Sequence, residues 1–111
     1  MQITESKVGA WTVLKLQGKL DDAGSAELKA ALAPHLPGGG AVALDFAETE
    51  YIASVGFRVL LQAFKEIRTA KGRLVLGNLS ETLRHFFDIA GLSAVFKIVP
   101  NLTEVINSPV V

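Results

Sequence analysis

Residues 41–77, AVALDFAETEYIASVGFRVLLQAFKEIRTAKGRLVLG, decide the fold, because two short apolar runs flank one amphipathic segment. The runs at 41–46 and 73–77 do not alternate strictly, which is typical of strands covered on both faces, as in parallel sheets. We expect Ser54 to cap the helix between them and Gly72 to end it. A strand, a helix and a strand in this order predict a parallel βαβ unit. The apolar stripe of the helix consists of Phe57, Leu60, Leu61, Phe64 and Ile67.

The chain before this unit adds two strands and one helix. Residues 11–18 are rich in β-forming residues and alternate in part, which predicts a strand with one face less buried. Residues 2–7 are expected to pair with it as an antiparallel edge strand through a turn at Gly9. A helix is expected over residues 23–36, before the proline and glycines at 37–40. Those glycines lead from a helix into a strand, the reverse of a phosphate-binding loop, so we interpret them as a turn.

After the unit, two capping patterns predict two more helices. One helix begins at residues 78–81 and ends at Gly91, and a short final helix begins at residues 101–104 and ends at Pro109. Residues 94–99 are the last predicted strand. The order β-β-α-β-α-β-α-β-α predicts an α/β fold with a mixed, mostly parallel sheet of about four or five strands and about four helices. We expect residues 1–111 to form a single domain.

Composition excludes several classes of function. Eleven Lys and Arg residues balance 11 Asp and Glu residues, so the chain lacks the basic surface that nucleic acid or an anionic membrane attracts. It has no cysteine, and its two histidines, His35 and His85, are dispersed and lie in predicted helices rather than in strand-end loops. No apolar run approaches the roughly 18–20 residues of a membrane span, and residues 1–5 do not begin a secretory signal. We therefore expect a cytoplasmic, non-enzymatic domain without metal or cofactor.

Acidic residues gather where two predicted strands end, at the edge where parallel sheets bind ligands and partners. Asp21 and Asp22 follow one strand, while Asp45, Glu48 and Glu50 follow another. Paired carboxylates perform acid–base chemistry only in a pocket that separates their pKa values, and no such pocket is visible in the sequence. Helix capping and solvation are therefore the expected roles of these acids.

Ser54, directly before the amphipathic helix, has two interpretations. A serine at a helix start contributes about 1 kcal/mol of stability as a cap. A phosphate on the same hydroxyl would meet free N–H groups, and Arg58, one turn later, would lean back toward it. The residues alone leave both interpretations open.

The ordered motifs resemble the STAS domain family, and specifically the single-domain anti-sigma factor antagonists of bacteria. Residues 18–21 (GKLD) resemble the family's G-x-L-D, and residues 44–46 (LDF) resemble its L-D-hydrophobic strand end. Residues 51–57 (YIASVGF) are similar to the signature aromatic-I-D-S-[ST]-G-L, and residues 77–98 follow its closing helix and strand. The resemblance covers nearly the whole chain and implies a mostly parallel sheet with helices packed largely on one side.

For function, the resemblance implies binding to an anti-sigma factor, a serine kinase of the histidine-kinase-like ATPase type, with release of its sigma factor. The kinase would phosphorylate Ser54 and abolish binding, and a serine phosphatase would restore it. The chain would bind no nucleic acid directly, would not enter a membrane, and would be a monomer or a weak homodimer. The residues expected at the partner interface are Asp21, Asp45, Ala53, Ser54, Val55, Gly56, Phe57 and Arg58.

Three residues depart from the family signature: Ala53 replaces its acid, Val55 its second Ser or Thr, and Phe57 its Leu. The first two favour an alternative, a constitutive STAS interaction module without a phosphate cycle, such as a sensory-assembly subunit or the cytosolic component of a lipid-transport system. A nucleotide-binding protein is a third interpretation, which the lack of a phosphate-binding loop disfavours. The sequence also leaves open whether exposed apolar side chains at Val55 and Phe57 serve self-association.

Overall fold

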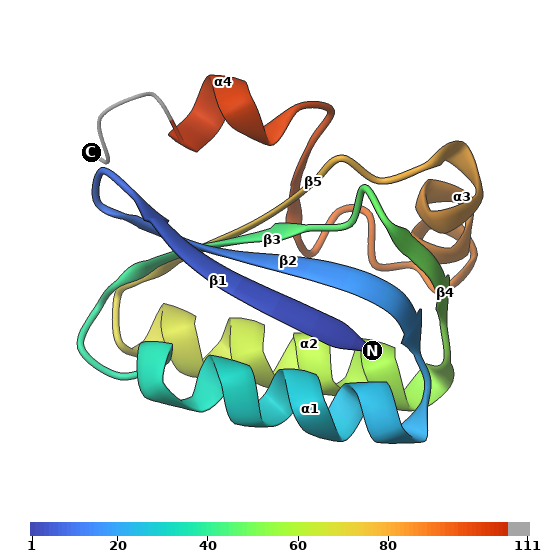
Figure 1. Cartoon of the computed structure of the whole chain (residues 1–111), viewed down its shortest axis with the longest axis horizontal. Coiled ribbons are helices and arrows are strands. Elements are labelled where there is room, and N and C mark those ends of the chain that lie inside the picture. The colour runs from blue at the N-terminus through green and yellow to red at the C-terminus, as the bar shows by residue number, and fades with distance from the viewer. Residues whose placement is uncertain (107–111) are drawn as a thin grey trace.

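The computed structural model describes residues 1–106, in which one mixed sheet is packed between helices (Figure 1). Its strand order is β1-β2-β3-β5-β6, and β4 pairs with the end of β2. β1 and β2 are antiparallel and every other pairing is parallel, as the βαβ pattern predicts. The elements are β1 (Gln2–Val8), β2 (Trp11–Leu20), α1 (Asp22–Leu32), the 3₁₀ helix η1 (Ala33–His35), β3 (Ala41–Asp45), β4 (Thr49–Ile52), α2 (Ser54–Thr69), β5 (Arg73–Gly77), α3 (Glu81–Ile89), β6 (Lys97–Val99) and α4 (Leu102–Ile106).

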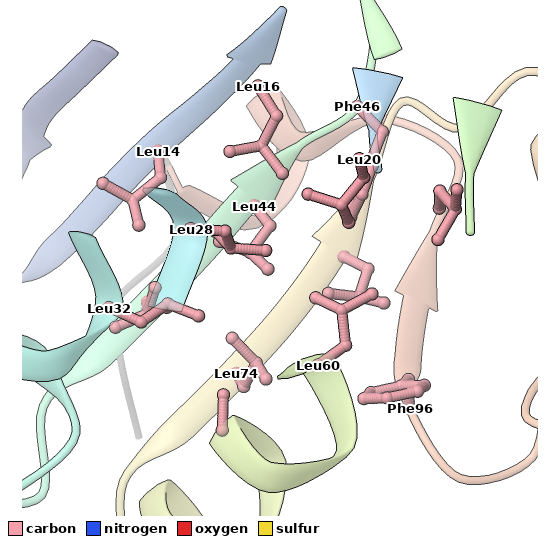
Figure 2. Packing of buried hydrophobic residues seen from close by; sticks show 14 of the residues in the cluster. Leu14, Leu16, Leu20, Leu28, Leu32, Leu44, Phe46, Leu60, Leu74 and Phe96 are labelled. Atoms are coloured by element: carbon pink, nitrogen blue, oxygen red, sulfur yellow. The ribbon is translucent and has the colours of Figure 1, made fainter. Parts of the chain in front are cut away.

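The central strands are covered on both faces, and their side chains divide by alternation. Leu14, Leu44 and Leu76 face α1 and α2 within the larger hydrophobic cluster, part of which Figure 2 shows. Their neighbours Val13 and Ala43 point the other way, into a smaller cluster that α4 closes. Figure 1 shows α1 and α2 side by side under the sheet, α4 on the opposite face and α3 beside β4. Burial on both faces explains why the central strands are continuous apolar runs.

The sequence does not predict β4, which raises the strand number to six. Thr49–Ile52 runs parallel to the last residues of β2, and the pairing contains a bulge between Gly18 and Lys19. Its buried Thr49 hydroxyl donates to the carbonyl of Leu16 at 2.8 Å. The strand has four residues and its two middle side chains are exposed, so it has neither the alternation nor the apolar run that marks a strand in sequence.

Two predicted element boundaries are wrong. The helix expected over residues 23–36 starts at Asp22, and its α-helical part ends at Leu32, where η1 follows. Pro34 accounts for this change, because proline has no N–H for an α-helical hydrogen bond. The strand expected over 94–99 is confined to Lys97–Val99, because a turn precedes it and places Phe96 in the core.

The helix ends also differ from the predicted caps. Ser80, not Asn78, caps α3, and its hydroxyl accepts from the N–H of Leu83 at 3.1 Å. Lys71, not Gly72, has the left-handed φ of 63° that ends α2. Glycine is still required at 72, because a Cβ there would lie 2.5 Å from the carbonyl oxygen of Gly40.

The predicted stop at Gly91 is confirmed by its φ of 72°. The expected stop at Pro109 lies outside the described residues. Within residues 1–106, no helix is long and apolar enough to cross a membrane.

Candidate functional site

Ser54 is the first residue of α2, which starts where β2 and β4 end (Figure 1). The N-cap residue is Ala53, with φ −83° and ψ 168°, so the prediction that Ser54 occupies this position is wrong. The N–H of Ala53 donates to the carbonyl of Leu20 at 3.0 Å, and its own carbonyl accepts from the N–H of Gly56 at 2.9 Å. The pairing of β4 with β2 therefore fixes where the helix begins.

The first turn of α2 has no side-chain cap, because the alanine at position 53 carries no acceptor. The side chain of Ser54 is exposed, and in the described part of the chain its hydroxyl has no hydrogen-bond partner. Unpaired N–H groups and the helix dipole make such a turn favourable for negative charge. The hydroxyl is thus both accessible and placed where an added phosphate would meet N–H donors.

Gly56 and Phe57 face the interior. A Cβ at Gly56 would lie 2.9 Å from Cγ of Leu20 and 3.0 Å from Cγ2 of Ile52, so glycine allows α2 to approach the strands closely. Phe57 is half-buried and packs edge to face against Phe87 of α3, with ring centroids 5.0 Å apart. These two residues shape the site from beneath, and the expectation that Phe57 is an exposed apolar side chain is wrong.

Val55 and Arg58 lie on the side of α2 that faces α1. Both line a groove between the two helices, together with Asp22 and Ser25 of α1. Val55 is half-buried rather than exposed, whereas Arg58 is exposed and has no ion pair among residues 1–106. Because Arg58 follows Ser54 by one helical turn, both side chains lie near the start of the same helix.

The two aspartates of the expected interface have structural bonds. Asp21 is the N-cap of α1, and its Oδ1 accepts from the N–H of Gly24 at 2.9 Å, which confirms the expected capping. Oδ1 of Asp45 accepts from the N–H of Ala47 at 2.9 Å and from the side-chain amide of Asn78 at 3.0 Å. Asp45 thus ties the end of β3 to the loop after β5, while Asp21 fixes the start of α1.

The other acids of this edge differ in their surroundings. Glu48 forms an ion pair with Lys15 at 2.9 Å and accepts a hydrogen bond from Gln17 at 2.8 Å. The hydrogen bond and charge of Lys15 lower the pKa of Glu48, and Glu48 in turn raises the pKa of Lys15. Glu50 lies in β4 rather than in a loop, and its side chain is exposed. The sequence does not predict the Lys15–Glu48 contact, because it joins β2 to the turn before β4, far away in the chain.

Sequence reasoning missed two further features near this edge. Asn78, with φ 60°, accepts from the N–H of Leu102 at 3.2 Å while its amide holds Asp45, so it links α4 to the site edge. Tyr51 is 46% exposed, packs edge to face on Phe86, and lies close to Ser54 in the chain. Ile89 lies on the same side of α3 as Phe86 and is 71% exposed. An asparagine after a strand and an isoleucine near a helix end carry no sequence signal for these roles.

The histidines lie apart from Ser54. Nε2 of His35 is 2.7 Å from Oε1 of Glu5, a contact that joins η1 to β1. His85 is an exposed residue of α3. Among residues 1–106, no three histidine or acidic side chains are grouped to hold a metal ion. What the arrangement offers chemically is an accessible hydroxyl at an uncapped helix start.

Comparisons with known proteins agree with this geometry. The family model described as "Mlab, STAS domain" matches residues 3–100. "Putative anti-sigma factor antagonist BtrV" of Bordetella bronchiseptica is 34% identical over 99 residues, covering 88% of this chain and 85% of that protein. The anti-sigma-B factor antagonist of Listeria monocytogenes is 35% identical over 82 residues, covering 73% of this chain and 72% of its own.

Solved structures share the fold at lower sequence identity. An anti-sigma factor antagonist from Mycobacterium paratuberculosis superimposes with a TM-score of 0.82 at 18% identity, covering 93% of this chain and 88% of that one. The Bacillus cell fate determinant SpoIIAA, solved in its phosphorylated form, gives a TM-score of 0.71 at 21% identity, covering 94% of this chain and 96% of its own. The expected α/β class, with its mostly parallel sheet, is confirmed, and the chain belongs to the STAS domain family, in which its curated relatives are anti-sigma factor antagonists.

Proposed function

We propose that this protein is an anti-sigma factor antagonist that binds an anti-sigma factor serine kinase and is switched off by phosphorylation of Ser54. The observation that carries the proposal is the exposed Ser54 hydroxyl in the first turn of a helix without a side-chain cap. A kinase needs an accessible hydroxyl, and the free N–H groups of this turn favour the phosphate once it is attached.

In this proposal the unmodified protein binds a kinase of the histidine-kinase-like ATPase type, and that binding releases a sigma factor. The names of the relatives in Bordetella and Listeria support antagonism of an anti-sigma factor. The phosphorylated form of SpoIIAA supports a phosphate cycle on this fold. A serine phosphatase would remove the phosphate and restore binding.

Arg58 supports Ser54 as the acceptor. It is exposed, follows Ser54 by one helical turn, and has no ion pair in the described part of the chain. A guanidinium in this position can pair with a phosphate on Ser54. The phosphate adds about −1.5 to −2 charges to a partner-facing surface and so changes its electrostatic fit.

The partner interface comprises the loops after β2 and β3 and the first turn of α2. Asp21 and Asp45 contribute by holding those loops, since their carboxylates are bonded to backbone and amide groups. Val55 and Arg58 offer side chains to the partner directly, and Gly56 and Phe57 act through the packing of α2.

The test is a phosphorylation assay with ATP and an anti-sigma factor serine kinase from the same organism, followed by mass spectrometry of the digested protein. We expect one phosphate on Ser54 and none on the Ser54→Ala variant. Ser6→Ala is the matched control, because Ser6 is an exposed serine on β1, outside any helix start. Equal labelling of Ser54→Ala and the unmodified protein would eliminate Ser54 as the acceptor.

Ala53 and Val55 favour one alternative function, a constitutive STAS interaction module in a sensory or lipid-transport assembly. Without the acid at 53 and a hydroxyl at 55, the loop is more apolar than the family signature. This alternative predicts stable binding to its partner and no phosphate on Ser54 under the same assay. Genes for transport proteins beside this one would favour it, whereas a kinase or phosphatase gene would favour the phosphate switch.

A further inference from the structure

A groove open to solvent runs between α1 and α2. It has two parts, with volumes of about 530 Å³ and 680 Å³, and the parts share Lys29, Leu36, Gln62 and Glu66 along their walls. The shared residues make it continuous from the Ser54 end of α2 toward Thr69. At 1.5 Å per residue, α2 could accompany a bound helix for roughly four turns.

Between its charged and polar side chains, the wall of the groove has apolar and small residues. Val55 and Val59 line it from α2, and Leu32 lines it from α1. Alanines follow one another at helical spacing along α1 and into the start of η1, all of them exposed, so a second helix could approach the backbone closely. These alanines are Ala23, Ala26, Ala30 and Ala33, of which Ala26 and Ala33 line the groove.

Ser25 gives an independent indication that this wall is incomplete. It lines the groove, is only 1% exposed, and its hydroxyl has no hydrogen-bond partner in the described part of the chain. A buried polar group without a partner costs on the order of 1–3 kcal/mol. A polar side chain from a bound segment would relieve that cost.

The charges indicate the kind of segment. Arg58, Lys29 and Lys65 line the groove and have no ion pair among residues 1–106, and the carboxylates that oppose these three cations are Asp22 and Glu66. α1 and α2 run in the same direction, so the positive ends of both helix dipoles lie at the Arg58 end (Figure 1). Asp22 is the opposing carboxylate at that end.

We propose that this groove receives an amphipathic helix of the partner protein, with its apolar side on the half-buried Val55, Val59 and Leu36 and a carboxylate meeting Arg58. The docking site follows from the groove itself, and its regulation rests on the function proposed above. A phosphate on Ser54 lies one turn from Arg58, so it neutralises this cation and repels the carboxylate. Loss of binding on phosphorylation is then a direct electrostatic effect.

The test uses two designed helical peptides of equal length and identical apolar face, one with glutamates along its polar edge and one with lysines. Each is titrated into the ¹⁵N-labelled protein, and affinity is measured by fluorescence anisotropy. We expect the glutamate peptide to bind more tightly, with shifts in α1 and α2. Arg58→Glu should lower the affinity for the glutamate peptide roughly three- to tenfold. Lys97→Glu makes the same charge change at an exposed residue of β6 and should leave this affinity unchanged.

Three results would overturn the proposal: equal affinity for both peptides, no binding of either, or shifts confined to the surroundings of the exposed Tyr51 and Ile89. A dimer of the free protein in sedimentation that Arg58→Glu dissociates would also overturn it, because a second copy would then occupy the groove. Phosphorylation of Ser54 should lower the affinity of the protein for the glutamate peptide. If no kinase labels Ser54 while the groove still selects the glutamate peptide, the proposed function fails and the docking site stands.

Discussion

Adjacent phenylalanines of α3, Phe86 and Phe87, give a matched test of the packing that supports the site. Phe87 is fully buried, and its ring meets those of Phe46, Phe57 and Phe96 edge to face at 6.4, 5.0 and 5.8 Å between centroids. Phe86 is half-buried and meets only Tyr51 in this way, at 6.2 Å. Replacing each by alanine changes helix propensity equally, so the difference between the variants isolates burial.

The two variants should differ severalfold in their effect on stability. Truncating a buried phenylalanine costs about 3–5 kcal/mol, and three lost aromatic contacts favour the upper part of that range for Phe87→Ala. Burying a large apolar side chain completely is worth about 1.5–3 kcal/mol, so the half-buried ring of Phe86 should cost about 1 kcal/mol. Since a domain of this kind is stable by roughly 5–15 kcal/mol, Phe87→Ala should remove a large share of it.

The assay is urea unfolding followed by far-ultraviolet circular dichroism. With a slope of about 2 kcal/mol per molar urea, Phe87→Ala should lower the midpoint by roughly 1.5–2.5 M and Phe86→Ala by about 0.5 M. Phe87→Leu should recover most of the loss, because it keeps apolar volume. Equal losses for the two alanine variants would refute the assignment of Phe87, rather than Phe86, to the core beneath α2.

Three further perturbations test the local geometry. Gly24→Ala should destabilise the protein, because the added Cβ would lie 2.3 Å from the carbonyl oxygen of Lys19. This clash should outweigh the helix propensity of alanine, which exceeds that of glycine by about 1 kcal/mol. An unchanged urea midpoint would contradict the close approach. Asp45→Ala should lower the free energy of unfolding by about 1–3 kcal/mol, since it leaves two donors without their acceptor, and a calorimetric melt identical to that of the unmodified protein would oppose this. Lys15→Met should raise the pKa of Glu48 in an NMR titration, and an unchanged pKa would count against the ion pair. Because the pKa of Glu48 is lowered in the folded state, the pair stabilises the fold above the ordinary glutamate pKa. That stabilisation is lost as pH falls through the lowered pKa.

The sequence predicts the parts of the fold that repeat a local period. The apolar runs of β3 and β5 and the stripe of α2 are each specified by neighbours within a few residues. β4 is not, because its pairing is with Gly18–Leu20 and its own four residues have no pattern. What makes Thr49–Ile52 a strand is the end of β2 beside it.

The candidate site was predictable in its residues more than in its geometry. Capping rules place Ser54 at the N-cap because it has a hydroxyl, but the hydrogen bond from Ala53 to Leu20 sets the cap one residue earlier. The apolar stripe of the helix predicts that Phe57 is turned inward, whereas its partner, Phe87 of α3, comes from a distant segment and is known only from the packing. The groove needs α1 and α2 to lie side by side, a relation between segments that no local pattern contains.

The proposed switch is tested most directly by the affinity of the kinase for the protein with and without phosphate on Ser54, measured by isothermal titration calorimetry. The unmodified protein should bind, and the Ser54-phosphorylated protein should bind at least roughly tenfold more weakly, a difference of about 1.4 kcal/mol. The Ser54→Ala variant should bind the kinase with the affinity of the unmodified protein. Addition of ATP should not abolish this binding, because the variant has no hydroxyl at position 54 to phosphorylate. Equal affinities for the phosphorylated and unmodified proteins would contradict the proposed switch.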